Sequence, residues 1–299
     1  MSINVKKRNG RGTETLQLEK MHKMVEMACD GLAGVSASQV EIQSGIQFYD
    51  GITTQEIQEI LIRSASDLID LDHPNYQFVA ARLLLFALRK QLFGRYHEHP
   101  SVLNHTKKGV SKGIYDAEIL DLYTEEEFEK LQSFIDHERD MLFTYAGLRQ
   151  VVDKYLVQDR SGGELYETPQ FMYMLIAATI FSRYNKEIRL DYVKKYYDAI
   201  SKHRINIPTP VMAGVRTPLR QYASCVLVDI DDTLDSIFSS DMAIGKYVAQ
   251  RAGIGINAGR IRGINSKIRD GEVQHTGVCL LYTSPSPRDA TLSRMPSSA

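Results

Sequence analysis

Basic side chains gather near the start of the chain, where their types and spacing could serve phosphate binding. The cluster sets six cations against Glu14 and Glu19, a local charge of +4, and its members are Lys6, Lys7, Arg8, Arg11, Lys20 and Lys23. Cationic groups beside the exposed N–H groups of a helix N-terminus can bind a polyphosphate. The same pattern is typical of a solvated face, so both interpretations stay open here. Lys90 is equally ambiguous, because a lysine near a helix C-terminus also offsets the helix dipole.

The cysteines are too few and too widely spaced for a zinc ribbon or a disulfide framework. Cys29, Cys225 and Cys279 form no CxxC pair. Cys225 follows Ser224 at the head of an apolar run, where a thiol can be a redox group or a small buried hydrophobe. Cys29 falls on the partly apolar side of a predicted helix and is interpreted as a buried hydrophobe.

Two arginines near an acidic helix cap form a third group. Arg262 and Arg269 follow Asp232 in the sequence, and such a set suits phosphate and ribose recognition or simply a solvated basic loop. Gly253-Ile-Gly255 matches part of a dinucleotide-binding fingerprint. A helix pattern precedes it where a strand is required, which argues against a Rossmann site.

Composition limits the class of protein to which these residues can belong. The chain has 299 residues, 43% of them hydrophobic, which suits two or three domains with real cores. Its 36 basic and 37 acidic residues give a net charge of −1, which excludes generic nucleic-acid binding. No apolar run approaches the ~20 residues of a membrane span, and the N-terminus lacks a signal peptide. We therefore predict a cytoplasmic protein without nucleic-acid or membrane partners.

A hairpin and four helices are predicted to position the basic cluster. Asn9-Gly10 indicates the turn of a hairpin over residues 5–16. Apolar residues spaced as in an amphipathic helix predict a helix from Glu19. Further helices are predicted over residues 38–48, over 54–69 with Thr53 or Thr54 as the cap, and over 74–94 with Pro74 at the start and Gly94 at the end. Together they form a small domain over residues 1–95.

The middle of the chain reads as mainly helical, and an α/β unit follows. Thr124 and Glu127 form a capping box that starts a helix. A second hairpin is predicted from strands at 155–157 and 164–166, helices over 169–184 and 190–200, and a break at Pro208-Thr209-Pro210. A buried strand over 225–229, a turn and helix over 232–251 and a strand over 254–261 then predict the opening of an α/β unit.

The last 21 residues differ in composition from the rest. From Cys279 the chain has three of its nine prolines and no periodicity. A disordered tail would explain this composition. The segment also resembles the translation of a transposase-type sequencing adapter over 279–289 and 293–299. We therefore expect residues 279–299 to be non-native, Cys279 to have no chemical role, and the natural protein to continue past Val278.

Ordered motifs over residues 3–278 resemble the large (α) subunit of class I ribonucleotide reductase. In the first part they are Val5-Lys-Lys-Arg-Asn-Gly10, Gln47-Phe-Tyr-Asp-Gly-Ile52 and Ala80-Ala-Arg-Leu83. They continue through Tyr123-Thr-Glu-Glu-Glu-Phe128, Phe134-Ile-Asp-His137, Lys154-Tyr-Leu-Val-Gln158 and Pro208-Thr-Pro210. They end with Gly214-Val-Arg-Thr-Pro218 and the run from Gln250 to Arg262.

The resemblance implies an α+β, mainly helical fold. It has an ATP-cone over 1–95, a helical domain over 96–207 and the first strands of a truncated ten-stranded α/β barrel over 208–278. The implied activity is the radical-based reduction of ribonucleoside diphosphates to deoxyribonucleoside diphosphates for DNA synthesis. ATP or dATP and deoxynucleoside triphosphates would be the effectors. Implied partners are a second large subunit, a small radical-generating β subunit that holds the metal cofactor, and thioredoxin or glutaredoxin; no metal is expected in this chain.

The resemblance also implies site residues. Cys225 would be one of two redox-active thiols, and Thr209, Ser224 and Gly253 would line the substrate site. An ATP/dATP activity site would use Lys7, Glu14, Gln17, Lys20, Thr54 and Lys90. The hairpin is one residue longer before Glu14 than the family version. A specificity site would use Asp232, Thr233, Leu234, Arg262 and Arg269, with the helix after Asp235 at a dimer interface.

Residues 1–278 contain no second redox thiol, radical cysteine or C-terminal cysteine pair, so this chain alone is expected to be inactive. One alternative is a non-catalytic nucleotide-sensing module built on an ATP-cone, although the four-cysteine zinc ribbon of such regulators is missing. The other is an anaerobic glycyl-radical reductase, which should not share the run from Gln250 to Arg262.

Overall fold

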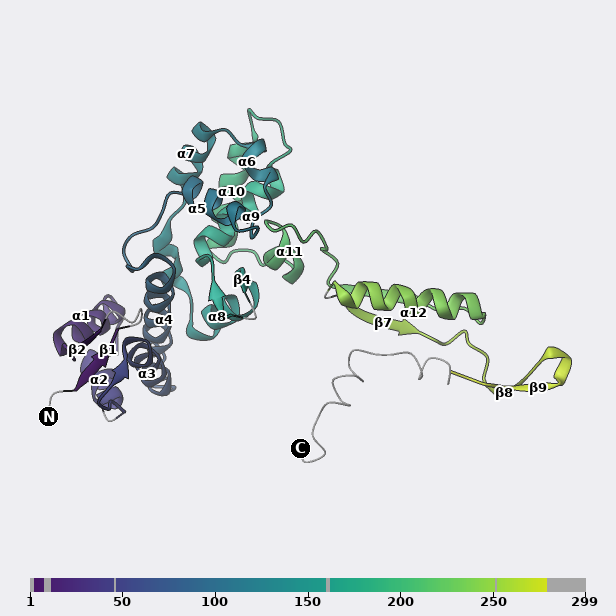
Figure 1. Cartoon of the computed structure of the whole chain (residues 1–299), viewed down its shortest axis with the longest axis horizontal. Coiled ribbons are helices and arrows are strands. Elements are labelled where there is room, and N and C mark those ends of the chain that lie inside the picture. The colour runs from purple at the N-terminus through teal and green to yellow at the C-terminus, as the bar shows by residue number, and fades with distance from the viewer. Residues whose placement is uncertain (1–2, 8–11, 46, 160–161, 251, 279–299) are drawn as a thin grey trace. The chain divides into compact units, whose positions relative to one another are not determined.

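The computed structural model describes residues 3–7, 12–45, 47–159, 162–250 and 252–278, and the chain divides into two compact units (Figure 1). The first unit runs to Arg220 and the second begins at Gln221. No helix in the described part of the chain has the length and apolar character needed to cross a bilayer.

The first unit begins with a small sheet covered by helices. Strands β1 (Asn4–Lys6) and β2 (Thr13–Thr15) form the predicted antiparallel hairpin, whose predicted turn, Asn9-Gly10, lies outside the described residues. Strand β3 (Ile52–Thr53) pairs with β1 in parallel, which the sequence did not predict because two residues show no period. Helices α1 (Leu18–Cys29), α2 (Ala37–Gly45), α3 (Thr54–Asp67) and α4 (Tyr76–Phe93) follow.

Local capping explains where these helices begin and end. Thr53, not Thr54, caps α3: its Oγ1 accepts a hydrogen bond from Glu56 N at 3.1 Å, and Thr53 N donates to the Glu56 carboxylate at 2.8 Å. Helix α4 ends at Gly94, whose φ of 78° is the left-handed conformation that glycine adopts most easily. Helix α2 ends at Gly45, before the predicted Phe48.

Seven further helices complete the first unit as described, and α9 lies at their centre. They are α5 (Val102–Ser111), α6 (Glu118–Leu122), α7 (Glu125–Phe134), α8 (Tyr145–Gln150), α9 (Pro169–Phe181), α10 (Arg189–Ser201) and α11 (Thr209–Gly214). Residues 169–178 of α9 are all buried, because this helix is apolar on every side and its neighbours surround it. The capping box of Thr124 and Glu127 starts α7 as predicted.

One prediction for this region is wrong in detail. The second hairpin exists, but its strands are β4 (Gln158–Asp159) and β5 (Glu164–Leu165), and Tyr155 instead ends a π-helical turn over Val151–Tyr155. The apolar residues there pack as a helix end, a tertiary effect that overrides their strand propensity. The predicted break at Pro208-Thr209-Pro210 follows the end of α10 at Ser201, and the same residues start α11, which was not predicted, because proline fits the first turn.

The second unit contains a β-α-β arrangement. Strands β6 (Cys225–Asp229) and β7 (Gly253–Asn257) pair in parallel, joined by α12 (Leu234–Ala249), as predicted. The prediction that β6 is buried is wrong, since Leu227 is 88% exposed. The sheet has only two strands among the described residues, and α12 packs against one face of it, so the other face of β6 is left uncovered. Strand β7 ends at Asn257, and an unpredicted hairpin of β8 (Ile264–Ile268) and β9 (Val273–Thr276) follows.

Candidate functional site

A cavity of about 150 Å³ lies between the small sheet and the helices that follow it. Five of the six residues predicted for the activity site line this cavity: Glu14, Gln17, Lys20, Thr54 and Lys90. They come from β2, the segment leading into α1, α1 itself, the first position of α3 and the last turn of α4. The fold therefore brings together residues that are up to 76 positions apart (14 to 90).

Lys7, the sixth predicted residue, reaches the same group through Glu14. Its Nζ lies 2.9 Å from Oε2 of Glu14. The hydrogen bond from Lys7 lowers the pKa of the Glu14 carboxyl, and the charges of Lys7, Lys20 and Lys90 lower it further. Three ammonium groups thus act on one carboxylate, which leaves a net positive charge beside the cavity.

Apolar side chains also line this cavity. Val5, Met21 and Ile57 line it and are buried, and Gln58 lies beside them. Ile57 and Gln58 were not predicted from the sequence. Their separation of three and four residues from Thr54 on one helix was the signal that could have found them. A site with one apolar wall and several ammonium groups can hold a molecule with a flat ring and a phosphate chain.

Cys225, Ser224 and Gly253 come together at the head of the two-stranded sheet. Cys225 and Gly253 are register partners, and Gly253 N donates to Ser224 O at 2.8 Å. A Cβ added at Gly253 would lie 3.4 Å from Ser224 O and 4.0 Å from Cys225 Sγ, so the glycine leaves the space beside the thiol open. Cys225 is exposed, which makes its sulfur accessible to a reaction partner.

The other cysteine in the described part of the chain has no such access. Cys29 is partly buried, and burial raises the pKa of its thiol to about 11. Because the thiolate is the reactive form, Cys29 is chemically inert at neutral pH. Thr209, predicted for the substrate site, belongs to the first unit, where its Oγ1 lies 3.5 Å from the Tyr155 hydroxyl.

Four of the five residues predicted for the specificity site lie together at the start of α12. Arg262 Nε lies 2.5 Å from Asp232 Oδ2, and the hydrogen bonds from Arg262 lower the pKa of that carboxyl. Thr233 caps α12 by accepting from Ser236 N at 3.1 Å, and Leu234 is the first, exposed residue of the helix. Arg269, the fifth residue, lies in the turn between β8 and β9. Within the described residues it makes no ion pair or hydrogen bond with Asp232.

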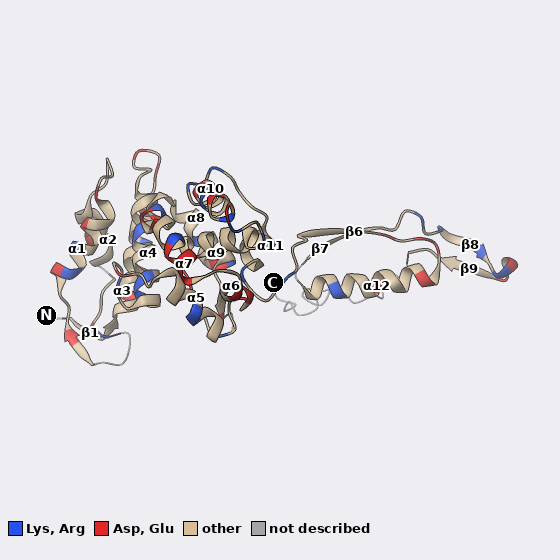
Figure 2. Ribbon diagram, turned by 90° about the horizontal axis from the view of Figure 1, so that it is seen from above, with Lys and Arg blue, Asp and Glu red and all other residues tan. Residues whose placement is uncertain are grey.

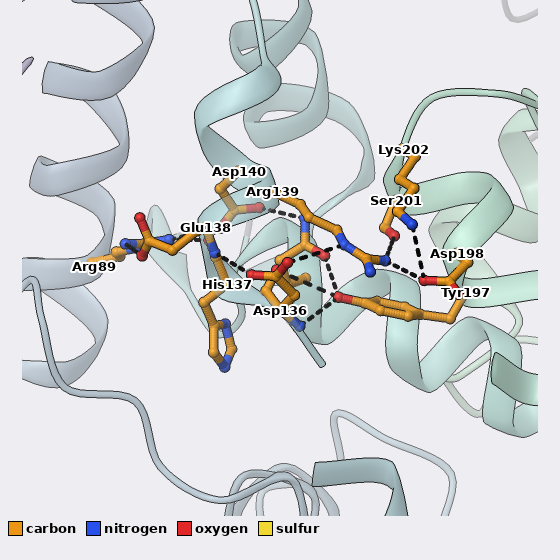
Figure 3. A network of polar contacts seen from close by, with 11 residues as sticks. Arg89, Asp136, His137, Glu138, Arg139, Asp140, Tyr197, Asp198, Ser201 and Lys202 are labelled. Atoms are coloured by element: carbon orange, nitrogen blue, oxygen red, sulfur yellow. Dashed lines mark hydrogen bonds and ion pairs between the residues drawn. The ribbon is translucent and has the colours of Figure 1, made fainter. Parts of the chain in front are cut away.

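A buried polar network joins α4 to the helical part of the first unit (Figure 3). Arg89, the residue before Lys90, donates from Nη2 to His137 O at 2.5 Å and to Asp140 Oδ2 at 3.4 Å. Asp140 also accepts from Gln170 Nε2 at 2.9 Å. Burial raises the pKa of Asp140 to about 6 in spite of Arg89. Within the described ranges, no group of three or more acidic, histidine or cysteine residues could hold a metal ion.

Comparison with known protein families gives a consistent result. Residues 3–91 match the ATP cone domain, residues 141–220 the all-alpha domain of ribonucleotide reductase, and residues 223–284 its barrel domain. The barrel match runs past Val278 into the segment predicted to be non-native. That prediction concerns residues 279–299, which lie outside the described residues.

Named relatives agree with these matches. The chain is 55% identical over 281 residues to ribonucleoside-diphosphate reductase 1 subunit alpha of Salmonella typhimurium, and 54% identical over 281 residues to that of Escherichia coli. Each alignment covers 94% of this chain and 37% of the relative. The subunit alpha of Enterobacteria phage T4 is 45% identical over 278 residues, which are 92% of this chain and 36% of the relative. The chain therefore spans little more than a third of the length of these relatives.

Proposed function

The chain belongs to the family of ribonucleotide reductase α subunits, and on this premise we propose that the protein containing it reduces ribonucleoside diphosphates to 2′-deoxyribonucleoside diphosphates for DNA synthesis. In this proposal the chain is the N-terminal, regulatory part of the enzyme. The matches at 141–220 and 223–284 favour a reductase over a nucleotide-sensing module that has a cone alone.

Cys225 is the proposed reductant. Two thiols give up two electrons and two protons to the substrate as they join in a disulfide, and the 2′-hydroxyl leaves as water. The second thiol and the cysteine that forms the thiyl radical would lie in the part of the relatives that this chain does not span. The exposed sulfur and the open space at Gly253 support this role, with Ser224 and Thr209 as the other substrate contacts.

The cavity of the first unit is the proposed activity site for ATP or dATP. Lys7, Lys20 and Lys90 would bind the phosphates as point charges, and the Thr54 hydroxyl and the Gln17 amide would add hydrogen bonds. Glu14 would hold the Lys7 ammonium group in position beside the cavity. The apolar wall at Ile57 suits a base.

The start of α12 is the proposed specificity site for a deoxynucleoside triphosphate or ATP, with Arg262 and Arg269 as phosphate contacts. Leu234, Phe238 and Met242 recur at intervals of four residues on one face of α12, and they are 59%, 61% and 60% exposed. Charged residues are sparse along this helix (Figure 2). We take this apolar stripe as the contact with a second copy of the subunit.

The remaining partners follow from the proposed reaction. A disulfide formed at Cys225 must be reduced again, which assigns thioredoxin or glutaredoxin as the electron donor and the reducing cytoplasm as the location. The radical would come from a small β subunit with its own metal cofactor.

Convergence of the predicted residues on one cavity is the observation that supports nucleotide binding most directly, and calorimetry of the whole chain with ATP tests it. Lys7→Ala and Lys90→Ala should each weaken binding by about tenfold or more, because a charge-assisted contact is worth ~1.5–3 kcal/mol. Lys23→Ala is the matched control, since Lys23 is exposed on α1 and does not line the cavity. Equal affinity of all three variants would reject the assignment.

A further inference from the structure

A second cavity in the first unit is larger than the proposed nucleotide site and shares none of its lining residues. Its volume is about 510 Å³, within the range of small-molecule sites. The end of α4, the loop after it, α5 and β5 supply its walls. None of the residues assigned above to catalysis or to effector binding lines this cavity.

Aromatic rings form part of the wall, and one of them is held rigidly. Phe93, His105 and Tyr166 line the cavity. His105 is 5% exposed, and its ring stacks on Phe171 with centroids 3.9 Å apart. Burial lowers the pKa of His105 to about 4, so the ring is neutral at pH 7.

Buried hydrogen bonds fix the position of His105. Its Nε2 lies 2.8 Å from the Tyr115 hydroxyl, which donates to Glu167 Oε2 at 2.9 Å. The hydroxyl proton is committed to Glu167, so His105 must donate from Nε2, and its Nδ1 is left as an acceptor. Glu167 is fully buried and also accepts from Arg216 Nε at 2.9 Å. The wall is therefore preorganised, without the entropy cost of ordering it around a ligand.

The charges that line the cavity balance in pairs, with one exception. Lys112 Nζ lies 3.1 Å from Glu164, and Glu98 lies 2.6 Å from Arg95 Nη1. Lys108 lines the same cavity, and its ammonium group has no ion pair with a described residue. Lys108 follows Asn104 by four residues, so both lie on the same face of α5. The cavity thus has one uncompensated positive charge beside an amide and aromatic rings.

We propose that this cavity binds a small aromatic anion, a planar ring bearing a carboxylate or phosphate, with the ring among Phe93, His105 and Tyr166 and the anionic group on Lys108. The competing explanation is that Lys108, in the last turn of α5, only offsets the partial negative charge of the helix C-terminus. The two explanations differ in a measurable way: the second requires a loss of stability on neutralising Lys108 and predicts no ligand.

The test is calorimetry of the whole chain with benzoate and phenyl phosphate, in saturating ATP so that the proposed nucleotide site is occupied. Three probes each lack one feature: cyclohexanecarboxylate has a saturated ring in place of the aromatic one, benzamide has no charge, and inorganic phosphate has no ring. We expect both aromatic anions to bind at least fivefold more tightly than these three. Lys108→Gln should weaken their binding at least fivefold.

Lys107→Gln is the matched control, because Lys107 is the neighbouring exposed lysine on α5 and pairs with Glu125 at 2.8 Å outside the cavity. Tyr166→Leu should weaken aromatic probes and leave the unfolding temperature within a few degrees. No binding of either aromatic anion, equal binding of inorganic phosphate, or equal affinity in Lys108→Gln and Lys107→Gln would overturn the proposal. Loss of ATP binding alone would count against the proposed activity site and not against this one.

Discussion

Nη2 of Arg89 lies 3.4 Å from Oδ2 of Asp140, and both side chains are almost completely buried. This pair joins the last helix of the cone to the helical part of the first unit, one residue from Lys90. A lone buried charge is costly, so each member depends on the other.

Replacing Arg89 with methionine should destabilise the first unit by roughly 3–5 kcal/mol at pH 8, because it leaves the Asp140 carboxylate buried without a cation. The loss of stability should be smaller at pH 5, because Asp140 can then take up a proton. Burial already raises the pKa of Asp140 to about 6. Urea unfolding at the two pH values measures this. Arg95→Met, at an exposed pair with Glu98, should cost less than about 1 kcal/mol. Similar losses at both pH values would contradict the prediction.

Gly109 should not tolerate a side chain. A Cβ there would lie 2.1 Å from Cδ2 of Tyr115, so Gly109→Ala must displace the ring that holds His105 and Glu167. We expect a loss of about 1–3 kcal/mol in the free energy of unfolding. Gly45→Ala is the control, since a Cβ at Gly45 meets nothing within 4 Å. Equal unfolding midpoints for the two variants would show that Tyr115 can move aside freely.

His22 should make the cone more stable at low pH. Its ring nitrogens lie 2.8 Å from Glu41 and 3.1 Å from Glu26, and the hydrogen bond with Glu41 raises its pKa. His22 therefore binds its proton more tightly in the folded state than in the unfolded state, where the pKa of histidine is about 6.5. The added stability is complete below that value and disappears as the pH rises through the folded pKa.

His22→Gln should accordingly lower the unfolding temperature at pH 5.5 and have less effect at pH 8.5. Thermal unfolding of both proteins at the two pH values measures the difference. A constant gap between wild type and variant would mean that the two carboxylates do not stabilise the imidazolium.

Cys225 should react with iodoacetamide much faster than Cys29 at pH 8. The first thiol is exposed, whereas the second is partly buried with a pKa raised to about 11. Peptide mass spectrometry over time separates the two and resolves Cys279 as well. Faster labelling of Cys29 would contradict the assignment of Cys225 as the accessible thiol.

If the complete protein is the reductase proposed above, Cys225→Ser should abolish its thioredoxin-driven multiple turnover, because a hydroxyl cannot supply the electrons that a dithiol gives up. Effector binding at Asp232 and Arg262 should persist, since oxygen and sulfur differ little in volume. A buried structural cysteine would behave in the opposite way, with stability reduced and turnover retained. Normal turnover in the variant excludes the redox role.

Residues 279–299 should be dispensable for the fold. A chain ending at Val278 should have the same unfolding temperature as the whole chain, because a segment translated from an adapter was never selected to pack with it. A decrease of several degrees would show that the segment contributes to stability and would count against its adapter origin.

Local signals in the sequence predicted much of the fold, and tertiary packing decided the rest. The Thr124 capping box and the helix stop at Gly94 have signals within a few residues, and both are confirmed. Strand β3 has two residues and a partner 47 positions away (5 to 52), so no local pattern could indicate it.

The candidate site divides in the same way. Residue types near the N-terminus indicated a cationic site, but the meeting of Lys90 with Glu14 depends on how α4 packs against α1 and α3. The Arg89–Asp140 pair has no sequence signal at all, because charged residues are exposed in most proteins. The Lys90–Glu14 proximity and the Arg89–Asp140 pair both depend on tertiary packing within the first unit, and spacing along the chain does not indicate either.

Parallel pairing of β1 with β3 has a consequence for how the cone can vary in evolution. Lys6 is the register partner of Thr53, so Lys7 and Thr54 each follow directly at the same end of the sheet. Glu14 is fixed separately, as the partner of Val5. Lys7, Glu14 and Thr54 all lie outside residues 8–11. A change of chain length between Lys7 and Glu14 that keeps both strand pairings would leave Lys7, Glu14 and Thr54 in their places, so that length alone is a poor guide to whether the cavity is intact.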